Sequence, residues 1–145
     1  MLVERLVAAR CADPFSHLGL QANPDGPGLK LTAWLPDALE VRVKDLKSGK
    51  VVATLAPTDE SGLFETVFTR RKNPFPYQLL ASYPDASTEF VDPYQFQDAG
   101  WAGLAELTSQ PENIYHTLGA QLRSVEHLGV QVEGVRFAVY APSAT

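Results

Sequence analysis

The chain has 145 residues, 45% of them hydrophobic, and its 17 acidic and 12 basic side chains give a net charge of −5. This length and composition are typical of a globular protein with one main core and exclude a disordered chain. The acidic balance, with no basic cluster larger than Arg70-Arg71-Lys72, argues against a nucleic-acid partner.

The cysteine content and the apolar runs indicate the compartment. Cys11 is the only cysteine, so no intramolecular disulfide can form, as in proteins of a reducing compartment. No stretch approaches the ~20 apolar residues of a membrane helix, and charges interrupt the N-terminus too often for a signal peptide. We therefore expect a cytoplasmic protein without a membrane partner.

Two short helical elements are predicted at the N-terminus. Residues 2–11 form an amphipathic helix, because apolar side chains recur there at helical spacing: Leu2, Val3, Leu6, Val7 and Ala9. Asp13 then precedes Pro14, the pattern of an N-cap followed by proline at the first helical position, and Gly19 suits a left-handed C-terminal cap. We expect one helical turn between them.

From residue 29 the apolar side chains alternate with polar ones, which predicts half-buried antiparallel strands. The residues expected to face inward in the first two strands are Leu29, Leu31, Ala33, Leu35, Leu39, Val41 and Val43. The predicted strands are 29–35, 39–45, 51–55, 63–68, 77–83 and 88–91. Turns rich in Gly, Pro, Asp and Ser separate them, so the chain is predicted to be all-β, an antiparallel immunoglobulin-like β-sandwich with a short N-terminal helix.

The alternation disappears after Asp92-Pro93-Tyr94, and residues 95–112 contain no clear strand. We interpret 95–112 as a linker. The alternation returns at Gly134, in the stretch "GVRFAVYAPSA", and proline ends it. This last strand is expected to lack a partner unless another segment takes the partner's place.

Two short motifs occur twice, in the same order. "FSHLGLQ" at 15–21 matches "YHTLGAQ" at 115–121, and "GLKLTAWLPDA" at 28–38 matches "GVRFAVYAPSA" at 134–144. The offsets are 100 and 106 residues, so the copies differ by six residues in between. We interpret this as a duplication in which a capped turn leads through a loop into the first strand of a sandwich. The second copy stops after that strand, which is expected of a fragment of a longer protein.

These motifs, together with "DPFSHLGL", "SGLFE", "DPYQF" and "NIYHTLGAQ", resemble the N-terminal part of bacterial glycogen branching enzymes over residues 13–145. "VRFAVYAPSA" alone is shared with modules that precede catalytic barrels in the α-amylase superfamily, debranching enzymes included. The resemblance implies four parts: an N-terminal helix at 1–12, a β-sandwich called the N1 domain at 13–94, the linker at 95–112, and at 113–145 the truncated start of a second β-sandwich, a family 48 carbohydrate-binding module.

The resemblance implies a role without catalysis for this segment. Branching is a retaining glycosyl transfer that forms α-1,6 branches in glycogen biosynthesis, and it needs a carboxylate nucleophile and a carboxylic acid about 5 Å apart. The barrel that carries them would follow this segment, so we expect no catalytic residue, cofactor or metal site here. His17, His116 and His127 are interpreted as polar turn residues, and Asp13 and Asp92 as caps or turn formers.

Two tryptophans are the candidate glucan-binding residues, because a flat apolar ring can stack on a pyranose face. Trp34 lies on the polar side of its strand, but Tyr140 takes its place in the second copy of the repeat, which favours a structural role for the ring. Trp101 lies in the linker, where it either docks between modules or stacks on glucan.

Three functions are compatible with these patterns. In the first, the segment is a non-catalytic part of a 1,4-α-glucan branching enzyme, binds α-1,4-glucan or glycogen beside the carbohydrate-binding and barrel domains of its own chain, and helps to select chain length. In the second, it is a purely architectural module that binds no sugar. In the third, it belongs to a debranching enzyme, which explains the first copy of the repeat poorly.

Overall fold

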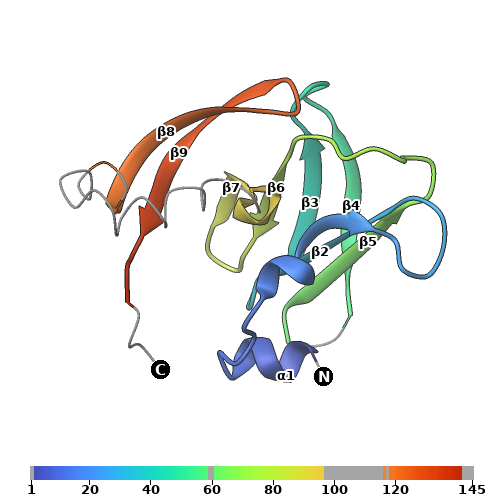
Figure 1. The fold of residues 1–145 in the computed structure, drawn as a ribbon. Helices are drawn as coiled ribbons and strands as arrows, with labels where there is room; N and C mark the ends of the chain where they lie inside the picture. The colour runs from blue at the N-terminus through green and yellow to red at the C-terminus, as the bar shows by residue number, and fades with distance from the viewer. Residues whose placement is uncertain (1, 59–60, 97–115, 117, 142–145) are drawn as a thin grey trace. The chain divides into compact units, whose positions relative to one another are not determined.

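The structure is a computed structural model that describes residues 2–58, 61–96, 116 and 118–141 (Figure 1). The chain divides into two compact units, Met1–Gln97 and Asp98–Thr145. Most of the predicted linker, from residue 97 to residue 112, lies outside the described residues.

The first unit is an antiparallel β-sandwich, as the sequence predicts. Its strands are β1 (Gly19–Ala22), β2 (Leu29–Trp34), β3 (Glu40–Asp45), β4 (Val51–Pro57), β5 (Leu63–Phe68), β6 (Tyr77–Ser82) and β7 (Ser87–Val91). Their order along the curled sheet is β1-β2-β5-β4-β3-β6-β7 (Figure 1). β4 joins the two layers, because its first residues pair with β3 whereas Ala56 and Pro57 pair with β5.

The hydrophobic core lies between the two layers. Its buried side chains are Leu31, Ala33, Val41, Val43, Leu55, Phe64, Phe75, Tyr77 and Leu79. The predicted inward alternation is confirmed in β2 and β3, but it is wrong for Leu39, which is 69% exposed. The strand begins only at Glu40, and Leu39 still belongs to the preceding turn, in which Asp37 has a left-handed φ of 66°.

The N-terminal helix is shorter than predicted. α1 spans Leu2–Val7 instead of running to residue 11, because Ala9 adopts a left-handed φ of 52° that a helix cannot continue through. The predicted helical turn is confirmed as the 3₁₀ helix η1 (Pro14–Ser16). Its N-cap, Asp13, accepts a hydrogen bond from the Ser16 N–H at 3.3 Å.

The second unit contains a β-hairpin formed by β8 (Gly119–His127) and β9 (Val130–Ala138). Leu128 and Gly129 form its two-residue turn, with left-handed φ values of 50° and 83°. The last predicted strand therefore begins before Gly134, and it ends at Ala138. β8, which the sequence patterns did not indicate, is the segment that takes the partner's place.

The two copies of the repeat pair their strands in the same register. Gly19 lies opposite Thr32 in the first unit. Gly119 lies opposite Ala138 in the second, and Ala138 is the residue that the repeat aligns with Thr32. Both glycines open their strand with a left-handed φ, +84° at Gly19 and +79° at Gly119, a conformation that glycine adopts without steric cost.

A side-chain hydrogen bond is repeated as well. The amide Nε2 of Gln21 donates to the Leu18 carbonyl at 3.2 Å, and that of Gln121 donates to the Leu118 carbonyl at 3.1 Å. In each copy the glutamine amide thus binds the carbonyl of the residue just before its own strand. The sequence repeat is therefore also a structural repeat.

Candidate functional site

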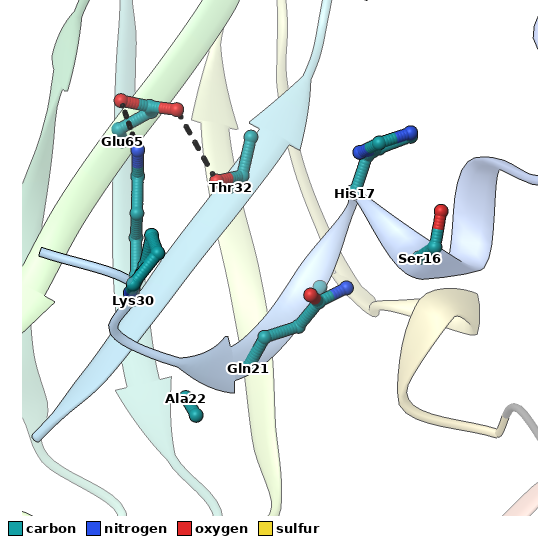
Figure 2. A pocket seen from close by; sticks show the side chains of 9 residues that line it. Ser16, His17, Gln21, Ala22, Lys30, Thr32 and Glu65 are labelled. Carbon is teal, nitrogen blue, oxygen red and sulfur yellow. Dashed lines mark hydrogen bonds and ion pairs between the residues drawn. The ribbon is translucent and has the colours of Figure 1, made fainter.

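A shallow hollow of about 180 Å³ lies on the first unit, over β1, β2 and β5 (Figure 2). Its polar lining residues are Ser16, His17, Gln21, Lys30, Thr32 and Glu65. Lys30 and Thr32 alternate with the core residues of β2, so both side chains point away from the core. η1 supplies Ser16 and ends at its C-cap His17.

The polar groups of the hollow are bonded within the protein. Lys30 Nζ lies 2.9 Å from Glu65 Oε2, and the Thr32 hydroxyl donates to Glu65 Oε1 at 3.4 Å (Figure 2). Gln21 Nε2 donates to the Phe15 carbonyl of η1 at 2.8 Å, in addition to its bond to the Leu18 carbonyl. The volume is below the roughly 300 Å³ at which small-molecule pockets begin. The hollow is therefore a shallow depression on the protein surface and not an enclosed binding pocket.

Trp34, the first predicted candidate, is half-buried beside the N-terminal helix. Its indole Nε1 donates to the Ser61 carbonyl at 3.1 Å, and its ring packs against a buried cluster made of Leu6, Leu18 and Leu63. These contacts give the ring a packing role in the first unit. Trp101, the second candidate, lies outside the described residues.

The "DPY" segment closes the first unit after β7. The Asp92 Oδ1 accepts a hydrogen bond from the Tyr94 N–H at 3.0 Å and caps the 3₁₀ helix η2 (Pro93–Gln95), as predicted. Asp92 is only 3% exposed, and its Oδ2 accepts a hydrogen bond from the Tyr77 hydroxyl at 2.5 Å. Sequence reasoning missed this contact, because no local pattern links Tyr77 in β6 to a residue 15 positions later.

Burial is the largest influence on the pKa values of Asp92 and Tyr77. It raises the pKa of the Asp92 carboxyl above its usual value, although the hydrogen bonds from Tyr77 and Tyr94 act in the opposite direction. Burial, followed by the Asp92 charge, also raises the pKa of the Tyr77 hydroxyl, which therefore remains a donor. A raised carboxyl pKa can mark a catalytic acid, but Tyr77 is fully buried and the pair is out of reach of a substrate.

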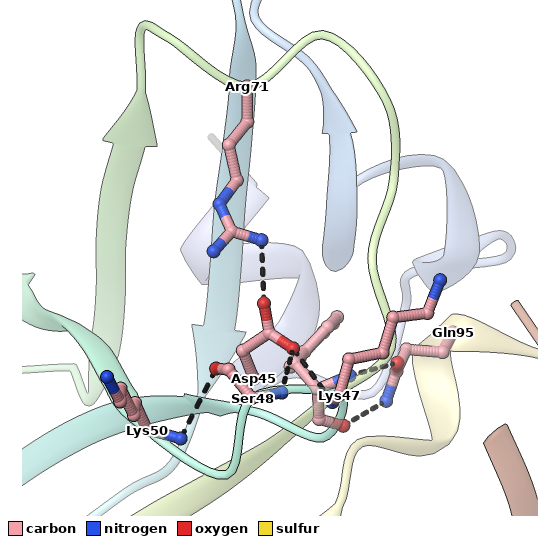
Figure 3. Close-up of polar contacts among 7 residues, drawn as sticks. Asp45, Lys47, Ser48, Lys50, Arg71 and Gln95 are labelled. Atoms are coloured by element: carbon pink, nitrogen blue, oxygen red, sulfur yellow. Dashed lines mark hydrogen bonds and ion pairs between the residues drawn. The ribbon is translucent and has the colours of Figure 1, made fainter. Parts of the chain in front are cut away.

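A second buried carboxylate, Asp45 at the end of β3, binds the turn after β3 to the loop after β5 (Figure 3). Its Oδ2 accepts from Arg71 Nη1 at 2.9 Å, and its Oδ1 accepts from the N–H groups of Lys47 at 2.9 Å and Ser48 at 3.3 Å. The Arg71 guanidinium also lies 3.9 Å above the Phe75 ring. Burial acts to raise the pKa of Asp45, but the hydrogen bonds and the Arg71 charge hold it below its usual value.

The three histidines are spread over the structure. His17 ends η1, His116 is exposed, and His127 ends β8 at the hairpin turn, where partial burial lowers its pKa. In the described residues, no group of three or more His, Cys, Asp or Glu side chains is arranged to hold a metal ion. No helix in the described part of the chain is long and apolar enough to cross a membrane.

Comparisons with known proteins match the chain along its length. A family model described as "alpha-1,4-glucan branching enzyme GlgB, N-terminal domain" matches residues 2–94. The 1,4-alpha-glucan branching enzyme GlgB of Pseudoalteromonas atlantica is 36% identical over 145 residues, which cover 99% of this chain and 20% of that protein. The enzyme of the same name from Shewanella sp. strain W3-18-1 is 39% identical over 141 residues, 96% of this chain and 18% of that protein. The chain spans about one fifth of the length of these relatives.

Among solved structures, two pullulanases overlap with parts of the chain. The pullulanase of Anoxybacillus sp. LM18-11 in complex with maltotetraose covers 54% of this chain and 11% of its own, with a TM-score of 0.45 and 21% identity. The apo pullulanase of Paenibacillus barengoltzii covers 62% and 16%, with a TM-score of 0.43 and 19% identity. The family match, in contrast, includes every strand of the first unit. This chain belongs to the family of N-terminal domains of the α-1,4-glucan branching enzyme GlgB.

Proposed function

We propose that this chain is the non-catalytic N-terminal segment of a 1,4-α-glucan branching enzyme that acts in the cytoplasm. The observation that carries the proposal is the 36% identity to such an enzyme over 145 residues, together with the N-terminal family match. The carbohydrate-binding and barrel domains would belong to the same polypeptide, and the barrel would supply the catalytic carboxylates. A debranching enzyme is less well supported, since the relatives that match almost the whole chain are branching enzymes.

The proposed role of the first unit is to assist glucan binding and the selection of chain length. The hollow over β1, β2 and β5 supports it, because Lys30 and Glu65 offer a donor and an acceptor that can exchange their mutual bond for bonds to sugar hydroxyls. Trp101 in the linker is the candidate ring for stacking on a sugar. Trp34 is the weaker candidate, since its ring already packs inside the first unit.

A purely architectural module is the second candidate function. It is favoured by the bonds that already connect the polar groups of the hollow and by the packing of Trp34. Such a module would contribute only by packing against its neighbours in the longer protein. The two candidates differ in one measurable respect, namely whether the first unit contacts sugar.

A deletion in the full-length enzyme tests whether the first unit assists glucan binding and the selection of chain length. Removal of residues 1–96 takes away the first unit and leaves β8 and β9. We expect an active enzyme with weaker glycogen binding and an altered distribution of transferred chain lengths, measured by debranching the product and separating the chains. Identical affinity and identical chain-length profiles would contradict the proposed role.

A pair of double variants tests the hollow itself. Lys30→Ala with Glu65→Ala removes the ion pair of the hollow, and Arg42→Ala with Glu40→Ala removes a more exposed ion pair on β3, outside the hollow, as the control. We expect a loss of glycogen affinity for the first pair only. Titration of this chain with maltoheptaose, followed by NMR amide shifts, gives the direct test: shifts confined to β1, β2, β5 or the linker support sugar contact, whereas no shifts support the architectural module.

A further inference from the structure

Positive charge is concentrated in two loops of the first unit. Five of the 12 basic residues of the chain lie there, although the chain as a whole has a net charge of −5. They are Lys47 and Lys50 in the turn after β3, residues 46–50, and Arg70, Arg71 and Lys72 in the loop after β5, residues 69–76. Neither loop contains an acidic residue. These five side chains are called the basic end of the first unit.

Asp45 joins the two loops of the basic end. Its carboxylate accepts from the Lys47 and Ser48 N–H groups of one loop and from Arg71 of the other, and it is the only described carboxylate bonded to either loop. Figure 3 shows the side chains of Lys47 and Lys50 extending from the turn on either side of Asp45. The fold thus brings together basic residues that are separate in the sequence, and one carboxylate balances only one of their five charges.

Four side chains of the basic end have no partner in the described part of the protein. Lys47, Lys50, Arg70 and Lys72 are exposed, and none of them makes a side-chain hydrogen bond or ion pair with another described residue. Like charges that the fold holds close together repel one another, and the local positive potential attracts anions. An anion that binds among these side chains therefore relieves their repulsion.

Arg71 differs from the other four side chains because the fold holds its guanidinium in place. The group lies 3.9 Å above the Phe75 ring, and its Nη1 lies 2.9 Å from Asp45 Oδ2. Its Nε and Nη2 groups have no hydrogen-bond partner among the described residues, and the side chain is 34% exposed. A guanidinium fixed in this way loses little conformational entropy when its remaining N–H groups bind an oxyanion.

The chemistry of the basic end favours phosphate over other anionic partners. A phosphate monoester carries nearly two negative charges and three acceptor oxygens, which match a fixed guanidinium surrounded by further cations. An acidic protein surface fits less well, because protein interfaces have an apolar core and neither loop carries an exposed large hydrophobic side chain. An unmodified glucan is neutral and has no group that would pair with these charges.

We infer that the basic end binds phosphate groups. Arg71 donates to the phosphate oxygens through Nε and Nη2, and the lysines and Arg70 supply further N–H donors from both loops. The phosphate is either an ester carried by a glucan chain or part of a small free phosphate compound. The basic end shares no residue with the hollow over β1, β2 and β5, so the inference does not depend on the proposed contact of the hollow with glucan.

The test titrates this chain with inorganic pyrophosphate and with maltoheptaose that carries one phosphate monoester, followed by NMR amide shifts and calorimetry. We expect shifts of the amides in both loops of the basic end. Lys47→Gln with Lys72→Gln removes one charge from each loop and should weaken the binding of the tighter probe by more than about tenfold, because charge-assisted hydrogen bonds are lost. Arg5→Gln with Arg10→Gln is the matched control, since it removes two exposed charges outside the basic end and should leave the Kd unchanged. Neither pair of variants removes a side-chain hydrogen bond or ion pair between described residues.

The two probes also distinguish the sources of the phosphate. Tighter binding of the maltoheptaose phosphate assigns the basic end to a phosphorylated glucan, whereas equal or tighter binding of pyrophosphate assigns it to a free phosphate compound. The inference would be overturned if neither probe shifted the amides of the two loops, or if unmodified maltoheptaose shifted them equally. Equal losses of affinity for the two pairs of variants would also overturn it. Tighter binding of hexaglutamate than of either probe would make an acidic peptide the partner instead.

Discussion

The two copies of the repeat share a strand register but differ in what covers their strands. Leu31 of β2 is fully buried in the core of the first unit, whereas Phe137, which the repeat aligns with it, is 75% exposed on the hairpin. In both copies a left-handed glycine opens the first strand, and a glutamine amide binds the carbonyl three residues before it. Local sequence thus determines which residues pair, and the surrounding strands determine which are buried.

The largest expected difference between the copies comes from removing the aligned core side chains. Leu31→Ala should lower the free energy of unfolding of the first unit by about 2–5 kcal/mol, because it leaves a cavity in the core. Phe137→Ala should change the stability of this chain by less than about 0.5 kcal/mol, because the ring is mostly in solvent. Urea unfolding followed by NMR amide intensities in each unit measures both. Similar losses for the two variants would contradict the difference in burial.

The closing contact of the first unit offers the next largest effect. Tyr77→Phe removes the hydroxyl that donates to the buried Asp92 carboxylate and should cost about 1–3 kcal/mol. Tyr83→Phe is the matched control, since the Tyr83 hydroxyl has no hydrogen-bond partner among the described residues. Chemical denaturation compares the two variants. Equal stability of both would show that the Tyr77 contact contributes nothing.

The two buried carboxylates of the first unit should respond to pH with opposite signs. The lowered pKa of Asp45 stabilises the fold above the pKa of the unfolded chain, near 4, and that contribution is lost as the pH falls. The raised pKa of Asp92 has the reverse effect, since its contribution is present below the unfolded pKa and is lost as the pH rises through the folded one.

Asparagine substitutions test these signs. The stability deficit of Asp45→Asn relative to the unaltered chain should shrink as the pH is lowered from 7 to 3. The stability of Asp92→Asn relative to the unaltered chain should improve as the pH is raised over the same range. Thermal unfolding at several pH values gives both slopes, and slopes of the same sign would rule out the assigned causes. The hairpin amides serve as the internal control, because both carboxylates lie in the first unit.

The smallest expected effect concerns the hydrogen bond that the copies share. Gln21→Leu and Gln121→Leu should each lower the stability of their own unit by about 0.5–1.5 kcal/mol, the usual value for a hydrogen bond to a backbone carbonyl. Amide hydrogen exchange in β1 and in β8 measures the two losses separately. If only one unit loses stability, the glutamine has different roles in the two copies.

Most of the first unit follows from local patterns in the sequence. The six strands from residue 29 to residue 91 are predictable because most of them alternate apolar and polar side chains and each is bounded by a clear turn. β1 has only four residues and β8 has polar side chains on most positions, so neither shows such an alternation. The sequence therefore predicts neither strand, although each pairs with the alternating strand of its own copy.

The contacts between distant residues were not predictable from patterns. Asp92 was expected only to cap a turn, and its bond to Tyr77 depends on β6 and the segment after β7 meeting in the folded chain. The bond of Arg71 to Asp45 likewise joins residues 26 positions apart. The repeat favours a structural role for Trp34, because Tyr140 is its aromatic counterpart, and in the structure the ring packs against the cluster of Leu6, Leu18 and Leu63.

The repeat sets the same strand register twice, and NMR cross-strand contacts in this chain test that shared register. We expect contacts between Gly19 and Thr32 in the first unit and between Gly119 and Ala138 in the second. A hairpin in which Gly119 lies opposite Phe137 or Val139 would contradict it, because a shift of one residue moves every side chain of the strand to the other face.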